Sequence, residues 1–362
     1  MRPITGYFFE DYTLGQKFVH ATPRTITHGD TALYLALTGS RNPLHCSDPF
    51  ARSLGYPSAP VDDLLVFHIA FGKTVADISY NAIANLGYAD CRFVQPVYIG
   101  DTIRAETEII GLRENSKGTS GVIYVRSNAF NQRDELVLTW VRWVMVHRRQ
   151  ASPDAVAEPV GITQFAGGVD RATHALPAFI KPSPNLETTT GSRRLWNDFS
   201  APDFQDLAAD FDATNALETI HHPAGMTIDE TDHTLATKLY QNTARVHFDA
   251  HHMQHGRFGK RLIYGGQVIS ICRALAYDGL ENALSILAIN GGTHHRPVFA
   301  GDTLYATSKV LMAWPINNHF GALRIKLSGY KNIEPGNAES IGEHSENQVL
   351  SLDYTVLMPR RS

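Results

Sequence analysis

Two histidines stand at matching places in a sequence that repeats itself. Residues 25–31, which lead to His45, align without a gap with residues 227–233, which lead to His247, at a constant offset of 202. Histidine has an ordinary pKa near neutrality and is the usual side chain for moving a proton in catalysis. Each half of the chain therefore carries one candidate general base.

A second repeated segment shows that the unit is a whole domain. Residues 96–102 (PVYIGDT) return as residues 297–303 (PVFAGDT), at an offset of 201. Such a period is far longer than the roughly 20 to 50 residues of a solenoid repeat. With 362 residues, 43% of them hydrophobic, the chain can form two cores of ordinary size. The sequence predicts two tandem copies of one domain.

The composition restricts the class of protein and of partner. A net charge of −4 argues against nucleic acid as the main ligand, since a phosphate backbone requires a basic surface. Residues 1–11 include acids where a signal peptide needs an apolar core, and no later run reaches the ~18 apolar residues of a membrane span. The three cysteines lie far apart without CxxC spacing, which favours reduced thiols. We expect a soluble cytoplasmic protein with no membrane partner.

Local patterns predict the same order of elements in both copies. Residues 30–37 form a short helix that ends at Gly39, and Asp62 or Asp63 can cap a second helix. The apolar residues of this second helix, between 64 and 78, cover more than one face, so it should be buried. Strands are expected at 90–98, 102–110, 121–130 and 136–147, and in the second copy a helix at 266–276 precedes strands at 286–295, 303–311, 319–330 and 348–358.

These elements define the fold class and the domain boundaries. One buried helix followed by a run of antiparallel strands is typical of an α+β fold in which the sheet wraps around the helix. Residues 150–193, rich in Pro, Ala, Thr and Gly, are expected to form a linker. We therefore place the first domain at residues 1–149 and the second at residues 194–362.

One loop resembles a known enzyme family. Residues 37–45 (LTGSRNPLH) are similar to the signature loop of the MaoC-like, (R)-specific enoyl-CoA hydratases, a Gly-Asp-x-Asn-Pro-x-His stretch in a hotdog fold. Residues 59–68 and 141–146 resemble the mesaconyl-CoA hydratases within that family. The resemblance covers most of residues 6–149 and, more weakly, the second copy. It implies a double hotdog and a hydro-lyase that reversibly hydrates mesaconyl-CoA to β-methylmalyl-CoA, with no metal and no cofactor beyond the CoA of the substrate.

The first copy matches only some of the catalytic residues of the family pattern. In the family pattern an aspartate and a histidine handle the water and its proton, while a backbone N–H at the start of the buried helix polarises the thioester carbonyl. The first copy matches Asn42 and His45. It has Ser40 at the position of the aspartate and Val61 where the glycine of the helix start would stand.

The second copy matches a different subset of the catalytic residues. It matches His247 and has Asn242 at the position of the aspartate. Gly265 and Gly266 follow Tyr264, a candidate substrate contact, at the start of its buried helix. Hydration of an unsaturated thioester passes through an enolate-like state, and a donor worth ~3 kcal/mol must face the thioester oxygen. The amides at this helix start, reinforced by the helix dipole, have that character.

Structural roles stay open as alternatives for the same residues. Asp62 and Asp63 would repel an oxyanion, but they could cap the helix, position water or replace the missing aspartate. His45 and His247 could simply bond to backbone groups, and the glycine pair could serve close packing.

Basic residues offer two kinds of binding site. A free carboxylate on the acyl group needs a cationic partner, for which Arg41 is the first candidate and Arg296 the second. The phosphates of CoA could bind a basic cluster that follows the histidine-rich residues 247–255. Those histidines include metal-ligand spacings, but no acid lies at ligand spacing beside them, and we expect no metal site. The cluster consists of Arg257, Lys260 and Arg261.

Two other functions and the oligomeric state also stay open. A hotdog thioesterase would hydrolyse the acyl-CoA, and release of free thiol would identify it. A non-catalytic acyl-CoA-binding hotdog is suggested by the missing aspartate, and binding without turnover would identify it. A homodimer is an open expectation, although two hotdogs in one chain already supply what single-domain relatives obtain by dimerising.

Overall fold

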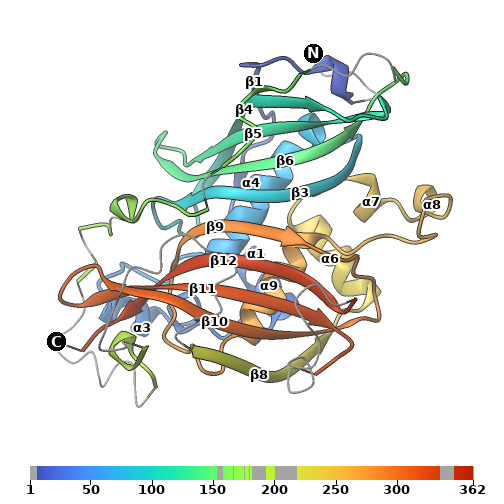
Figure 1. The fold of residues 1–362 in the computed structure, drawn as a ribbon. Helices are drawn as coiled ribbons and strands as arrows, with labels where there is room; N and C mark the ends of the chain where they lie inside the picture. The colour runs from blue at the N-terminus through green and yellow to red at the C-terminus, as the bar shows by residue number, and fades with distance from the viewer. Residues whose placement is uncertain are drawn as a thin grey trace.

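The computed structural model describes residues 6–152, 158–165, 167–174, 176–178, 180–181, 193–199, 218–334 and 346–361. Within these residues both halves have the same layout, in which a long helix lies against an antiparallel sheet (Figure 1). No described helix combines the length and the apolar character needed to cross a membrane.

The first half contains four helices and six strands among the described residues. The helices are α1 (His28–Thr38), α2 (Pro43–Cys46), α3 (Asp48–Ser53) and α4 (Asp63–Ile78), and the strands are β1 (Lys17–Val19), β2 (Arg24–Thr25), β3 (Ala82–Phe93), β4 (Thr102–Glu114), β5 (Ser120–Phe130) and β6 (Leu136–His147). The 3-10 helix η1 (Phe9–Asp11) precedes them.

The second half repeats this order after a connecting region that covers residues 148–217. That region includes β7 (Val160–Gly161) and the 3-10 helices η2 (Arg171–Thr173) and η3 (Trp196–Phe199). The second half then consists of β8 (Glu218–Thr227), α6 (Glu230–Leu239), α7 (Arg245–Phe248), α8 (Ala250–Met253), α9 (Gly265–Leu275), β9 (Ile286–His294), β10 (Thr303–Pro315), β11 (Phe320–Lys331) and β12 (Gln348–Pro359).

The central helix of the first half is buried as its sequence predicts. All residues 64–75 of α4 are buried, which requires apolar side chains on every face. Its N-cap is Asp62, whose side chain accepts a hydrogen bond from the Leu64 N–H, and the helix ends before Ser79. The expected first helix is also confirmed, since α1 ends at Gly39 in the left-handed conformation that favours glycine.

The two halves share one sheet, which confirms the double hotdog predicted for the fold. Strands follow the order β1-β4-β5-β6-β3-β9-β12-β11-β10-β8, so β3 of the first half pairs with β9 of the second (Figure 1). In this antiparallel pair Tyr88 lies opposite Gly292, and Cys91 lies opposite Ile289. Helices α4 and α9 lie side by side on one face of the sheet, joined by a bond of 2.8 Å between His68 Nε2 and Ser270 Oγ.

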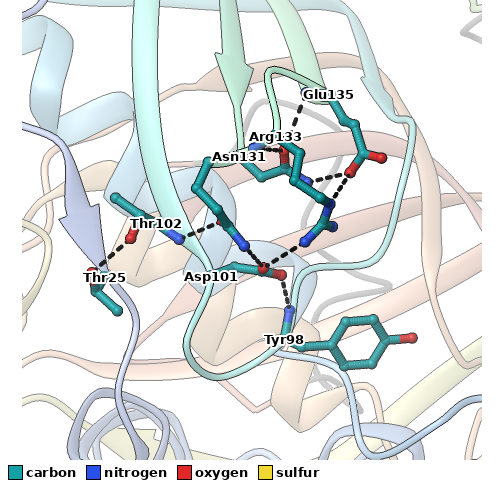
Figure 2. A network of polar contacts seen from close by, with 8 residues as sticks. Thr25, Tyr98, Asp101, Thr102, Asn131, Arg133 and Glu135 are labelled. Carbon is teal, nitrogen blue, oxygen red and sulfur yellow. Dashed lines mark hydrogen bonds and ion pairs between the residues drawn. The ribbon is translucent and has the colours of Figure 1, made fainter.

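The repeated Gly-Asp-Thr segment forms a structural turn in both halves. The Asp101 carboxylate accepts a hydrogen bond of 2.9 Å from the Tyr98 N–H and one of 2.6 Å from Gln132, which fastens the turn to the β5–β6 loop (Figure 2). Asp302 accepts the equivalent bond from the Phe299 N–H, also at 2.9 Å. The glycine before each aspartate has a φ near +95°, a conformation that side chains with a Cβ rarely adopt. The repeated segment at residues 96–102 and 297–303 therefore stabilises the fold and takes no part in the chemistry.

One strand differs from its predicted position. Residues 90–98 were the expected first strand, but β3 spans Ala82–Phe93. Its first half contains Asn, Gly and Ala, which are poor strand formers, and is held in place by pairing with β6, while β9 pairs with residues 88–92. The boundaries at 149 and 194 stay a prediction, because much of residues 150–217 lies outside the described part of the chain.

Replacing Asp101 by Ala should lower the free energy of unfolding by about 1–3 kcal/mol, because the Tyr98 N–H and the Gln132 amide lose their acceptor. Urea unfolding followed by circular dichroism measures this change. Asp134→Asn is the control, because this neighbouring aspartate is exposed and Asn tolerates its positive φ, so the effect should be about 0.5 kcal/mol or less. Equal losses for both variants would contradict a special role for Asp101.

Candidate active site

The two repeated histidines are held in the same way. His45 Nδ1 lies 3.1 Å from the Pro60 carbonyl oxygen, and His247 Nδ1 lies 3.0 Å from the Leu262 carbonyl oxygen. A carbonyl oxygen only accepts, so Nδ1 carries the proton in both rings and donates it. This bond fixes the tautomer and leaves Nε2 with a lone pair, the state that a general base requires.

The Asp63 carboxylate occupies the space beside the first histidine, His45. His45 Nε2 lies 3.7 Å from Asp63 Oδ2, and the same carboxylate accepts a hydrogen bond of 2.7 Å from the Ile286 N–H of the second half. Burial raises the pKa of Asp63 to about 6, although the neighbouring His45 works against this shift. The cavity beside these groups has a volume of about 20 Å³, enough for about one water molecule and too small for an acyl group.

The other predicted residues of the first copy hold the local structure. Asp62 Oδ1 caps α4 by accepting a bond of 3.0 Å from the Leu64 N–H, and Ser40 Oγ donates to Asp62 Oδ2 at 3.5 Å. Asn42 Nδ2 donates to the Leu284 carbonyl oxygen at 2.8 Å, which links this loop to the second half. The start of α4 is therefore both capped and negatively charged.

The second histidine borders a pocket of about 680 Å³, within the size range of ligand sites. His247, Asn242, Tyr264 and Gly265 line one part of it. The end of α4 and the start of β3 line another part, from Phe71 to Tyr88, so both halves of the chain form the pocket. Of the two predicted sites, only the one in the second copy has room for a substrate.

The start of α9 differs from that of α4 in charge and in capping. Its N-cap is Tyr264, and no side chain caps it. A Cβ on Gly265 would lie 2.5 Å from His294 Nε2, and a Cβ on Gly266 would lie 2.5 Å from His68, so both positions require glycine. The first N–H groups of a helix have no partner within it, and here they lie beside the pocket.

The structure corrects the predicted alignment of the two helix starts. The sequence comparison places Val61 opposite the helix glycine, but Asp63 is the first residue of α4 and Gly265 is the first residue of α9. The two helix starts thus differ by a carboxylate at the same position. A negatively charged oxygen can approach the start of α9, whereas Asp63 repels it from α4.

Three residues of this region were not predicted from the sequence. His294 lines the pocket, and burial lowers its pKa to about 4, as it does for His247. His68 lies between the two central helices, where burial lowers its pKa to about 3. Arg142 lines the pocket from β6. His294 stands three residues before the repeated Pro297, a signal that could have been used, whereas nothing near Arg142 in the sequence marks it.

The pocket lining carries positive charge and no acid. Among its described residues there is no aspartate or glutamate, while four arginines line it. Asn242 is buried, and its Oδ1 accepts a hydrogen bond of 3.2 Å from the Ala244 N–H. The pocket therefore suits an anionic ligand. The four arginines are Arg142, Arg245, Arg257 and Arg296.

The other predicted basic residues lie elsewhere. Arg41 is exposed, lines the small cavity of the first copy and forms an ion pair of 2.9 Å with Asp278. The Lys260 ammonium lies 4.2 Å from the centre of the Phe299 ring, and Arg261 pairs with Glu230. Neither lines the large pocket. Within the described residues, no three or more His, Cys, Asp or Glu side chains are grouped to hold a metal ion.

Comparisons with known proteins agree with this geometry. A family model described as mesaconyl-CoA hydratase matches residues 4–332. The β-methylmalyl-CoA dehydratase of Chloroflexus aurantiacus is 48% identical over 98% of each chain, and the mesaconyl-CoA hydratase of Cereibacter sphaeroides is 46% identical over 99% of this chain and 100% of its own. A solved MaoC domain protein dehydratase from C. aurantiacus superimposes with a TM-score of 0.85 at 46% identity, with both chains fully covered. A double-hotdog protein of Mycobacterium tuberculosis gives a TM-score of 0.69 at 25% identity, over 98% of this chain and 99% of its own.

Stability should rise with pH between about pH 4 and 6.5. Five buried or half-buried histidines have a folded-state pKa of about 3 or 4, so in this range the unfolded chain binds more protons than the folded one. Asp63 opposes this effect, because its raised pKa of about 6 makes the folded state bind a proton, but it is one group against five. The histidines are His68, His222, His233, His247 and His294.

Thermal unfolding followed by circular dichroism at pH 4.5, 5.5 and 6.5 measures this dependence. We expect Tm to increase at each step, and His233→Gln should make the increase smaller because it removes one of the five groups. A Tm that stays constant or falls as pH rises would contradict the burial of these histidines in neutral form.

Proposed function

The chain belongs to the mesaconyl-CoA hydratase family, and on this premise we propose that it is a hydro-lyase that reversibly converts mesaconyl-CoA to β-methylmalyl-CoA. The observation that carries the proposal is the 680 Å³ pocket, where His247 and the uncapped start of α9 lie together. Hydration of an enoyl thioester needs both features, a proton-transfer group and a donor to the thioester oxygen.

In the proposed mechanism the helix start binds the thioester carbonyl. The oxygen accepts hydrogen bonds from the N–H groups of Gly265 and Gly266, and the helix dipole adds positive potential. These contacts strengthen as charge moves onto the oxygen in the enolate-like state, and one such donor is worth roughly 3 kcal/mol. The absence of Cβ atoms at both positions lets the rings of His294, His68 and Tyr264 pack against this helix start.

His247 transfers the proton. Its Nε2 takes a proton from water while the water oxygen bonds to C3 of the acyl group, and the C=C electrons move toward the thioester oxygen. The imidazolium then returns the proton to C2, which balances the addition and restores the neutral ring. Burial lowers the pKa of His247 to about 4, so the ring is neutral at the start of the reaction, and its imidazolium form favours return of the proton to the carbon.

Asn242 fits a positioning role for the water. It stands at the place of the family aspartate and lines the same pocket as His247. An amide can donate and accept hydrogen bonds but cannot take a proton at neutral pH. In this proposal His247 therefore handles the proton by itself, while Asn242 orients the water.

The mouth of the pocket suits the phosphates of CoA. Arg257 and Arg296 line the pocket and are exposed, so their guanidinium groups can reach a phosphate in solvent. Lys260 and Arg261 do not line it, and we assign them no contact with the ligand. The first copy contributes the opposite wall, and His45 with Asp63 serves as a structural pair that fills the equivalent space.

Replacing His247 by Gln should lower kcat for mesaconyl-CoA by roughly 10²–10⁴-fold, the usual effect of losing general acid–base help. His45→Gln is the matched control, because it removes the equivalent ring at the filled cavity, and its kcat should stay within about threefold of the wild type. Loss of ultraviolet absorbance from the enoyl thioester measures both rates.

The opposite result, a severe loss from His45→Gln with His247→Gln near the wild type, would move the active site to the first copy. A thiol reagent in the same assay detects free CoA, and its release at the rate of enoyl loss would show thioester hydrolysis and not hydration.

A further inference from the structure

Arg142 is a fully buried arginine in the wall of the large pocket, and it has no acidic partner among the described residues. It belongs to β6 and has no measurable exposure to solvent. Burying a charge without a counter-ion is costly, and proteins normally pair such groups. The nearest partners of its guanidinium are neutral, so Arg142 departs from the rule that buried charges are paired with an opposite charge.

Its hydrogen bonds leave part of the guanidinium unused. Nη2 donates to Thr74 Oγ1 at 2.8 Å and to Ser79 Oγ at 3.1 Å, both at the end of α4. Nε and Nη1 are buried and have no acceptor. Buried donors are rarely left in this state. Burial lowers the pKa of Arg142 only to about 10, so the group still carries its charge at neutral pH.

A continuous series of rings connects Arg142 to the catalytic histidine. The ring centres of His247 and Tyr264 are 5.6 Å apart, and those of Tyr264 and Phe71 are 5.7 Å apart. The Arg142 guanidinium carbon lies 4.2 Å from the centre of the Phe71 ring. All four residues line the same pocket and form a continuous part of its wall between His247 and Arg142.

The internal symmetry of the chain shows that the two halves place an arginine on different elements. In the first half Arg142 lies opposite Tyr88 of β3, and in the second half Tyr354 lies opposite Ile289 of β9. Tyr88 and Ile289 are equivalent at the offset of 201, so Tyr354 occupies the place of Arg142. The open pocket therefore has its buried arginine on the sheet, whereas the small cavity is lined by Arg273 of α9, whose guanidinium carbon lies 5.8 Å from the centre of the Tyr354 ring.

We propose that Arg142 binds the free carboxylate of the acyl group and makes the enzyme specific for dicarboxylic acyl-CoA thioesters. This inference rests on the proposed function. Nε and Nη1 lie on different sides of the planar guanidinium, and either of these unused donors can form a charged hydrogen bond with a carboxylate oxygen. Pairing also neutralises a negative charge next to C3, which would otherwise oppose the growth of charge on the enolate. Arg41 and Arg296 are less suited, because both are exposed and Arg41 already pairs with Asp278.

The test compares kcat/KM for mesaconyl-CoA and for tiglyl-CoA, in which a methyl group replaces the free carboxylate. Arg142→Met should lower kcat/KM for mesaconyl-CoA about 100-fold or more and leave that for tiglyl-CoA within about threefold, so that the preference between the two collapses. Arg142→Lys keeps a positive charge but changes the shape and reach of the donor group, and it should fall between the wild type and Arg142→Met. Arg296→Met is the control at the pocket mouth, and it should affect both substrates equally.

Each outcome distinguishes this inference from the proposed function. A wild-type protein that does not hydrate mesaconyl-CoA refutes the proposed function. A wild type that does so, with equal losses for both substrates in Arg142→Met, refutes the carboxylate role and leaves Arg142 as a support for α4.

If the variants do not fold, inhibition of the wild type decides the question. Methylsuccinyl-CoA should inhibit about 30-fold or more strongly than 2-methylbutyryl-CoA, and equal inhibition overturns the inference.

Discussion

The pairing of β3 with β9 is the constraint on which the rest of the structure depends. It joins two hotdog sheets into one and brings α4 and α9 side by side, with His68 bonded to Ser270 between them. As a result, the start of α9 and the end of α4 border one pocket, and the start of α4 and the end of α9 border the small cavity. Neither half could form a site alone, because each site takes its walls from both.

Within this symmetric frame, charge distinguishes the two sites. A single carboxylate, Asp63, stands at the start of α4 where Gly265 stands at the start of α9. Asp63 contacts His45 and the backbone of β9, so it occupies the space that a thioester would need. The other site keeps free amides, a neutral histidine and an arginine without an acid. The two copies therefore share one backbone fold and differ in the charge at the start of the central helix.

The sequence predicted those parts of the molecule that depend on local patterns. The repeat, the burial of α4, the histidine pair and the glycines of α9 all follow from spacing and residue type. The start of β3 was placed wrongly, because its pairing with β6 overrides poor strand propensity. The importance of Arg142 could not be predicted, since its neighbours come from distant segments. Likewise, no local pattern indicates that Asp63 fills one site while the other stays open.

The central claim is that one pocket, at the start of α9, is where the thioester binds. A crystal structure with methylsuccinyl-CoA, which has no C=C bond to hydrate, tests it most directly. The account predicts the acyl group in the pocket lined by His247 and Tyr264, with the thioester oxygen within hydrogen-bond distance of the Gly265 or Gly266 N–H. A thioester bound beside His45 and Asp63, or one whose oxygen faces away from α9, would contradict it.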